Sequence, residues 1–247
     1  MAEKGMLVDT SKCTACRGCQ VACKQWNELS AETTSFFASD AGYQNPPDLS
    51  AATYCLVKFH SAGNGSGDPE WLFRKHQCMH CTNAACVEVC PVDAMQKNAD
   101  TGFVFVDEEV CIGCGACVAA CPFEVPHLTS ADPKKAKKCW ACLDRVTNGE
   151  ETACAKTCPS GAISFGDRSA MVTQAQARKA ELELKGKTAY LYGVDELGGL
   201  HQIYVLLMDP SLYGLPTADE LDLSSRRAYL LYLSEQAKQY LKKAVSF

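Results

Sequence analysis

Apolar positions occur along this chain in short runs, and their arrangement predicts a mixture of strands and helices. Residues 53–60 and 70–75 have the pattern of two strands, and a stretch rich in Gly, Asn and Ser joins them. We therefore expect a β-hairpin with a loose loop. Residues 103–106 and 162–165 predict two further short strands. Upstream of the hairpin, residues 45–48 (NPPD) predict irregular backbone, because proline restricts both itself and the residue before it.

The last third of the chain has the periodicity of helices. Residues 170–184 have helical composition, which Gly186 ends. Thr217 and Glu220 have the spacing of a capping box. After this cap, apolar residues mark one face of a predicted terminal helix: Leu223, Leu230, Leu233, Ala237, Leu241 and Ala244. Such a face could pack on the same protein or dock against a partner subunit, and amphipathicity alone does not separate the two.

The candidate chemistry lies in the 17 cysteines, sixteen of which form four groups of four. Motif one has the spacing C-x2-C-x2-C-x3-C, motif two C-x2-C-x4-C-x3-C-P, motif three C-x2-C-x2-C-x3-C-P and motif four C-x2-C-x11-C-x3-C-P. In motif order, the sixteen residues are Cys13, Cys16, Cys19, Cys23, Cys78, Cys81, Cys86, Cys90, Cys111, Cys114, Cys117, Cys121, Cys139, Cys142, Cys154 and Cys158. The remaining cysteine, Cys55, is expected to be a small buried hydrophobic residue.

These spacings predict iron–sulfur ligation. Thiolate is the soft ligand that iron–sulfur clusters select, and a [4Fe–4S] cluster takes four of them. Sixteen ligands therefore predict four [4Fe–4S] clusters. Tetrahedral zinc is the alternative, and motif four by itself, with its eleven-residue gap, could be a zinc ribbon. Disulfides are disfavoured, because neighbouring thiols in a C-x2-C-x2-C triplet would compete for one another.

Two internal repeats indicate which motifs pair. Residues 8–9 precede motif one by the interval that separates residues 106–107 from motif three, and residues 90–95 resemble residues 158–163. This is the pattern of a two-cluster ferredoxin, in which the fourth cysteine of each run binds the other cluster. We expect motif one to pair with motif four and motif two with motif three. The predicted ligand sets are Cys13, Cys16, Cys19 with Cys158; Cys139, Cys142, Cys154 with Cys23; Cys78, Cys81, Cys86 with Cys121; and Cys111, Cys114, Cys117 with Cys90.

The predicted fold class is α+β, with two ferredoxin-like modules related by a pseudo-twofold repeat. Residues 1–25 and 135–168 would form the first module, and residues 76–134 the second. Residues 26–75 would be an insertion that contains the β-hairpin. Residues 169–247 would be a helical C-terminal extension that ends in the terminal helix.

Charge and hydropathy limit the partners of this chain. Its 247 residues carry a net charge of −5, which argues against nucleic acid as a partner. The first six residues contain no apolar stretch of the kind found in signal peptides. The apolar run at residues 203–208 is far shorter than the ~20 residues that span a bilayer, so no transmembrane segment is predicted.

A few residues near the motifs could tune or shield a cluster. His80, inside motif two, could donate a hydrogen bond to a cluster ligand or have a purely structural role. The lysine-rich run at residues 134–138 could raise a nearby reduction potential or form a solvated loop. Trp140 lies between two motif-four cysteines and is expected to shield a cluster from water.

The cysteine plan resembles the four-cluster iron–sulfur subunits of molybdenum and tungsten oxidoreductases of the dimethyl-sulfoxide reductase family, over about residues 6–166. A narrower similarity is to the iron–sulfur (beta) subunit of formate dehydrogenase. It rests on residues 13–26 (CTACRGCQVACKQW), 45–48 (NPPD), 139–145 (CWACLDR) and 192–199 (YGVDELGG). The resemblance implies a non-catalytic electron-transfer subunit, and the sequence contains neither a glycine-rich nucleotide loop nor a nucleophile–base pair.

The resemblance also implies partners. A separate large subunit with a molybdenum or tungsten bis-pterin centre would oxidise formate, and this chain would carry the electrons to an acceptor such as a cytochrome c or another redox subunit. Membrane-bound members of the family carry a transmembrane helix on this subunit, which is not predicted here, so a soluble complex is expected. Family members are often exported together with the large subunit, which implies a periplasmic location, with the cytoplasm as the alternative. The same wiring role in a sulfur, nitrogen or sulfoxide reductase, or a freestanding polyferredoxin, remains an alternative.

Overall fold

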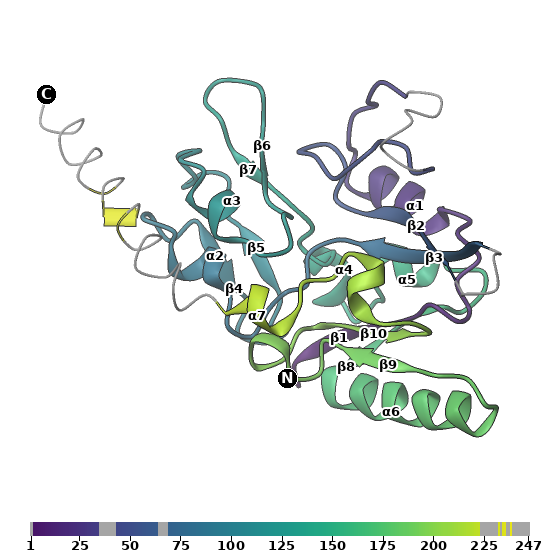
Figure 1. The fold of residues 1–247 in the computed structure, drawn as a ribbon. Coiled ribbons are helices and arrows are strands. Elements are labelled where there is room, and N and C mark those ends of the chain that lie inside the picture. The colour runs from purple at the N-terminus through teal and green to yellow at the C-terminus, as the bar shows by residue number, and fades with distance from the viewer. Residues whose placement is uncertain are drawn as a thin grey trace, which may run out of the picture.

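A four-stranded mixed sheet organises the fold of the computed structural model, which describes residues 2–34, 43–63, 69–222 and positions 232, 234, 235 and 238 (Figure 1). The strands are β1 (Lys4–Asp9), β8 (Ile163–Asp167), β9 (Tyr190–Tyr192) and β10 (Gln202–Leu206). Their order is β8-β1-β10-β9. Strand β1 runs parallel to β10, with Met6 opposite Gln202, and antiparallel to β8. Of the terminal helix predicted from residue 223 onward, only positions 232, 234, 235 and 238 are described, and they are helical.

Helix α6 (Arg168–Leu184) covers one face of this sheet. Side chains alternate between the two faces of a strand, so Leu7 and Ile203 pack with Met171 of α6, whereas Met6 and Tyr204 belong to the core on the other face. All five residues of β10 are buried. A strand that is covered on both faces has no polar alternation, which explains the continuous apolar run at residues 203–208.

The C-terminal extension differs from the expected helical one. It contains the predicted helix as α6, but residues 190–192 and 202–206 add strands β9 and β10 to the sheet that β1 and β8 share. The pairing of β1 with β10 joins the two ends of the chain. Local sequence pattern cannot reveal such a pairing, because it depends on two segments that are remote in sequence.

Short elements complete the extension. They are η1 (Glu196–Gly198), η2 (Pro210–Tyr213) and α7 (Ala218–Leu221). The capping box predicted before α7 is confirmed: the backbone N–H of Glu220 donates to the Thr217 hydroxyl, and the Glu220 carboxylate accepts from the Thr217 N–H at 2.8 Å.

The insertion forms an antiparallel pair of strands, β2 (Leu56–Gly63) and β3 (Pro69–His76). Strand β2 begins and ends later than the strand predicted at residues 53–60, so Cys55 lies just before it rather than inside it. Strand β3 extends the strand predicted at residues 70–75 at both ends. This β2–β3 hairpin packs against η2 of the extension, where the His60 ring lies beside Gly214. Helix α1 (Gly18–Trp26) leads from motif one toward the insertion.

Residues 78–137 contain only small elements, and we call them the ribbon half. Helices α2 (Ala85–Glu88) and α3 (Ala116–Ala120) pack beside two ribbons, β4 (Met95–Lys97) with β5 (Val104–Val106) and β6 (His127–Leu128) with β7 (Ala136–Lys137). Because the β6–β7 ribbon joins residues on both sides of position 134, it crosses the boundary predicted between the two modules. Residues 4–27 and 138–222, with α4 (Leu143–Val146) and α5 (Ala153–Lys156), form the sheet half.

Phe103 anchors the seam between the two halves. Its side chain is 1% exposed and packs with Ala141, Leu143 and Val146 of the sheet half. Beside it, the backbone N–H of Lys4 donates to the carbonyl of Thr101 at 2.9 Å. Within the described residues, no helix is long and apolar enough to cross a membrane.

Candidate iron–sulfur centres

The structure gathers the sixteen motif cysteines into four sets, numbered after the motif that supplies three members. Site one groups Cys13, Cys16 and Cys19 with Cys158. At site two, Cys81 faces Cys78, Cys86 and Cys121. Site three is a cavity lined by Cys90, Cys111, Cys114 and Cys117. Site four is a cavity lined by Cys23, Cys139, Cys142 and Cys154. Each set therefore takes three cysteines from one motif and the fourth from its partner motif.

Left-handed backbone turns curl each cysteine loop around its site. Arg17 has φ 61° in motif one, His80 has φ 47° in motif two, Gly115 has φ 78° in motif three and Ala141 has φ 59° in motif four. Left-handed residues are uncommon outside glycine, so their recurrence between cysteines marks a shared local design. Turns of this kind direct successive backbone N–H groups into one concavity, which suits an anionic group. The fourth cysteine then follows on or just after a short helix and reaches the neighbouring site.

Several N–H groups donate to the cysteine sulfurs. The backbone N–H of Met95 lies 3.4 Å from the Sγ of Cys90, and that of Ala136 lies 3.3 Å from the Sγ of Cys111. At site four, the side-chain amide of Asn27 lies 3.6 Å from the Sγ of Cys23. Hydrogen bonds to thiolate sulfur stabilise negative charge, so they are one of the means by which a protein sets a cluster potential.

The donor sets fit iron–sulfur clusters chemically. Burial raises the pKa of Cys117 and of Cys142 to about 12, and the pKa of Cys121 and of Cys139 to about 11. Free thiols at these positions therefore hold their protons, and a bound metal must displace them. Among the described residues, no three His, Cys, Asp or Glu side chains converge on a point suited to a single metal ion. At sites three and four the thiols line a cavity instead, which is the arrangement that a multi-atom cluster requires.

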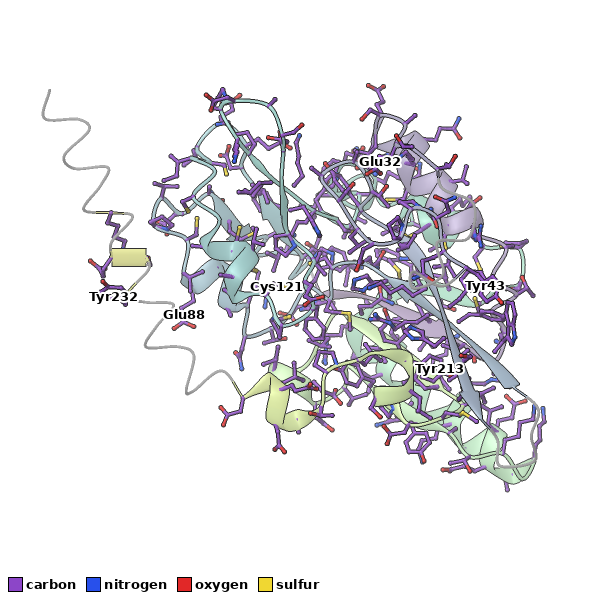
Figure 2. All side chains as sticks on the ribbon, turned by 45° about the horizontal axis from the view of Figure 1, so that its top comes forward. Glu32, Tyr43, Glu88, Cys121, Tyr213 and Tyr232 are labelled. Atoms are coloured by element: carbon purple, nitrogen blue, oxygen red, sulfur yellow. The ribbon has the colours of Figure 1, made fainter. Side chains whose placement is uncertain are left out.

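Neighbouring cysteines place the sites in the order one, four, two, three. Cys55 faces Cys19 of site one and Cys23 of site four. Cys139 of site four lies within electrostatic range of Cys78 of site two. Finally, Cys86 of site two lies within electrostatic range of Cys117 of site three. Figure 2 shows Cys121, a member of site two, between the two halves of the molecule, with Tyr43 toward the edge of the half that carries motif one.

Exposure distinguishes the ends of this row from its middle. Cys16 of site one and Cys114 of site three are the exposed members of the four sets. All four cysteines of site four are buried. The row of sites therefore reaches solvent at both of its ends and passes through the interior between them.

His80 has a defined role in the packing of site four. The backbone N–H of Val104 donates to its Nδ1 at 3.0 Å, so the ring proton lies on Nε2, which is 3.8 Å from the Sγ of Cys139. Burial lowers the pKa of His80 well below its usual value and keeps the ring neutral. His80 therefore has both of the roles considered from the sequence. It has a structural role, because it accepts a hydrogen bond from the backbone of β5, and it donates toward the sulfur of a site-four cysteine. Trp140 lines the same site-four cavity.

Other residues near the sites carried weaker sequence signals. The lysines of the run at residues 134–138 differ in their environment. Lys138 is buried and donates to backbone carbonyls, whereas Lys137 forms an ion pair with Glu108 at the surface. Lys75 is 1% exposed and was not singled out, since one lysine in a strand pattern has no signature. Burial lowers its pKa, but nearby cysteines in their thiolate form outweigh burial and raise the pKa well above its ordinary value.

Comparison with known proteins agrees with this chemistry. The family model of a 4Fe-4S dicluster domain matches residues 69–168, which contain motifs two, three and four. The class defined by the fold and the sites is therefore that of ferredoxin-type proteins with [4Fe–4S] clusters.

Relatives narrow the class to one family. The iron–sulfur subunit of the nitrate-inducible formate dehydrogenase of Escherichia coli K12 is 41% identical over 90% of this chain and 76% of its own length. The beta subunit of formate dehydrogenase 2 (cytochrome c-553) of Nitratidesulfovibrio vulgaris is 37% identical over 85% of this chain and 96% of its own length. Hydrogenase-2 operon protein HybA of Escherichia coli O157:H7 is 32% identical over 90% and 75%. This chain belongs to the family of formate dehydrogenase iron–sulfur subunits.

Proposed function

We propose that this chain relays single electrons within a formate dehydrogenase complex, through four [4Fe–4S] clusters held by the sixteen motif cysteines. The observation that carries the proposal is the row of four cysteine sets, with an exposed cysteine at each end and a fully buried set inside. When bound, each cluster accepts and releases one electron. The chain positions the clusters, shields the inner ones from water and supplies hydrogen bonds to their sulfurs.

The crossed sets support the proposal of two ferredoxin-like modules related by a pseudo-twofold repeat. Sites one and four exchange Cys23 and Cys158, and sites two and three exchange Cys90 and Cys121. We place the first module at residues 1–25 and 138–168 and the second at residues 76–137, with residues 26–75 inserted, because the β6–β7 ribbon crosses the boundary predicted at residue 134. The strands that the extension at 169–247 adds to the sheet then stabilise the first module.

The partners follow from the relatives. A catalytic subunit with a molybdenum or tungsten bis-pterin centre would deliver electrons at one exposed end, and an acceptor would collect them at the other. The name of the Nitratidesulfovibrio relative includes cytochrome c-553, which favours a cytochrome c as the acceptor. Co-export with the catalytic subunit would place the complex in the periplasm.

Iron and acid-labile sulfide analysis of the anaerobically purified complex tests the number of clusters. We expect about sixteen iron and sixteen sulfide per chain, since each cubane contains four of each. Formate added to the same sample should then produce electron paramagnetic resonance signals of reduced [4Fe–4S] clusters. A colourless protein with about one zinc per motif would refute the proposal.

A second catalytic partner is supported by one specific relative. A hydrogenase-2 operon protein is 32% identical over 90% of this chain, so related sequences also occur outside formate dehydrogenase. The same wire could then serve another oxidoreductase. Copurification of a large subunit that reduces a dye with hydrogen, and not with formate, would favour this second function.

A further inference from the structure

Lys75 is a buried cation with an unusual set of neighbours. It lies on β3 with 1% of its surface exposed. More exposed lysines nearby pair with carboxylates, as Lys24 does with Glu32 and Lys58 with Asp48. Among the described residues, Lys75 has no carboxylate partner. A buried ammonium without an anion costs several kcal/mol, so another source of negative charge is expected beside it.

Cysteines of two different sites supply the surroundings of Lys75. Its ammonium lies within electrostatic range of Cys154 and Cys139 of site four, of Cys19 of site one, and of Cys55. Its hydrogen-bond partner Gln77 also lines the site-four cavity. Sites one and four are also the pair that exchanges Cys23 and Cys158. The lysine therefore lies at the junction of two neighbouring sites rather than at the edge of one.

A buried network of amides holds the ammonium in this position. The Nζ of Lys75 donates to the Oε1 of Gln77, and the Nε2 of Gln77 donates in turn to the Oε1 of Gln202. Both glutamines are 1% exposed. The same Gln77 amide lies 3.5 Å from the Sδ of Met6, so strands β1, β3 and β10 together fix the lysine. No member of this network neutralises the positive charge.

Four thiolates outweigh the positive charge of an oxidised cubane core, so the bound group is an anion, and each added electron makes it more negative. We propose that Lys75 is the shared counterion of the clusters at sites one and four, and that it raises the reduction potential of both. The fixed charge stabilises the reduced form of each cluster more than its oxidised form. Electrons are thereby favoured on the clusters of sites one and four, at this end of the row of sites. The inference rests on the proposed function, because it requires clusters at both sites.

The test is a redox titration of the anaerobically purified complex, followed by electron paramagnetic resonance. In Lys75→Met, which removes the charge and keeps a similar length, two of the four couples should move to more negative potential. We expect their reduction equilibrium constants to fall at least tenfold, which is about 59 mV for a one-electron couple. The other two couples should stay unchanged, and Lys75→Arg should keep the wild-type potentials.

Arg74→Met is the matched control. Arg74 is the neighbouring buried cation on β3, but the groups that act on its charge are Tyr204, Tyr192 and Asp48 rather than the cysteines. We expect its four couples to stay at wild-type potentials. Unchanged couples in Lys75→Met with full iron content would overturn the inference, as would an equal shift in Arg74→Met.

Iron content separates the remaining outcomes. Loss of iron from Lys75→Met but not from Lys75→Arg would show the same requirement for charge through cluster retention. Loss of iron from both variants would overturn the inference, because shape rather than charge would then be needed. A wild-type complex without iron would instead refute the proposed function itself.

Discussion

The sheet half and the ribbon half contain similar cysteine motifs but achieve their stability differently. In the sheet half, α6 and the four-stranded sheet enclose a core without cysteine, made of Leu7, Met171, Ala175, Leu182, Ala189, Ile203 and Val205. The ribbon half has only two-stranded ribbons, and its largest core of buried residues consists of Ala94, Met95, Val104, Cys111, Cys117 and Ala136. A two-stranded ribbon is marginal on its own. We therefore expect the ribbon half to depend on bound clusters for folding more than the sheet half does.

Iron removal should produce the largest difference in stability between the two halves. Anaerobic chelation of the full chain should remove hydrogen-exchange protection from β4, β5 and α3, because metal-binding free energy is folding free energy where the core is small. Strands β1 and β10 should keep most of their protection. Mass spectrometry of exchanged peptides measures both. Cys55→Ser, which changes a cysteine outside the four sets, should leave the pattern unaltered in the iron-loaded protein. Equal loss of protection in both halves would contradict the comparison.

The seam between the halves should give the next largest effect. Phe103→Ala should lower the free energy of unfolding by about 3–5 kcal/mol, the range for truncating a buried phenylalanine. It should also uncouple the two halves, since the ring packs on Leu143 and Val146. Denaturant unfolding of the loaded protein, followed both by the cluster absorbance and by tryptophan fluorescence, measures this. Phe105→Ala on the same ribbon is the control, because Phe105 is only partly buried. A cost for Phe103→Ala no larger than that for Phe105→Ala would show that the seam is not a stabilising contact.

Two glycines sharpen the position of the seam. Gly102 and Gly161 both have positive φ, at 76° and 61°. An added Cβ at Gly102 would collide with the ring of His201, whose Nδ1 lies 2.7 Å from the Lys4 carbonyl, whereas at Gly161 it would meet nothing within 4 Å. We expect Gly161→Ala to cost about 1 kcal/mol from backbone strain alone. Gly102→Ala should cost at least twice as much in thermal unfolding, and similar costs would mean that His201 moves aside freely.

Acid should have the smallest effect, confined to the β2–β3 hairpin over the sheet half. Burial, with help from Arg74 and Lys58, lowers the pKa of His60 to about 4 from its ordinary value of 6.5. The folded state thus binds fewer protons than the unfolded state between these two values. The stabilisation is complete above pH 6.5 and is lost as the pH falls through about 4. The protection factors of the β2 amides, corrected for the pH dependence of intrinsic exchange, should therefore fall from pH 7 to pH 4.5, and fall less in His60→Gln. An identical acid response in the variant would assign the effect to other groups, such as His76.

The sequence carried the local features of this molecule but not its long-range ones. Cysteine spacing identified the four motifs, and the strand pattern at 53–60 and 70–75 identified the β2–β3 hairpin, because each signal lies within one short segment. The parallel pairing of Met6 with Gln202 could not be predicted, since neither strand carries a mark of its partner. The position of Lys75 beside two sites could not be predicted for the same reason. Its importance comes from burial beside two sites, which only the assembled fold reveals.

The crossed sets also have a consequence in time. Sites two and three have all their cysteines once residue 121 has been synthesised, because their members lie between residues 78 and 121. Site four waits for Cys154 and site one for Cys158, although motif one is the first to be made. The sheet beside them waits for β10 to end at Leu206. Domains fold during synthesis as their residues emerge. The cysteines of motif one are therefore synthesised first, but their ligand set is completed last. We therefore expect the thiols of motif one to stay reduced and without a cluster for longer than those of the other three motifs.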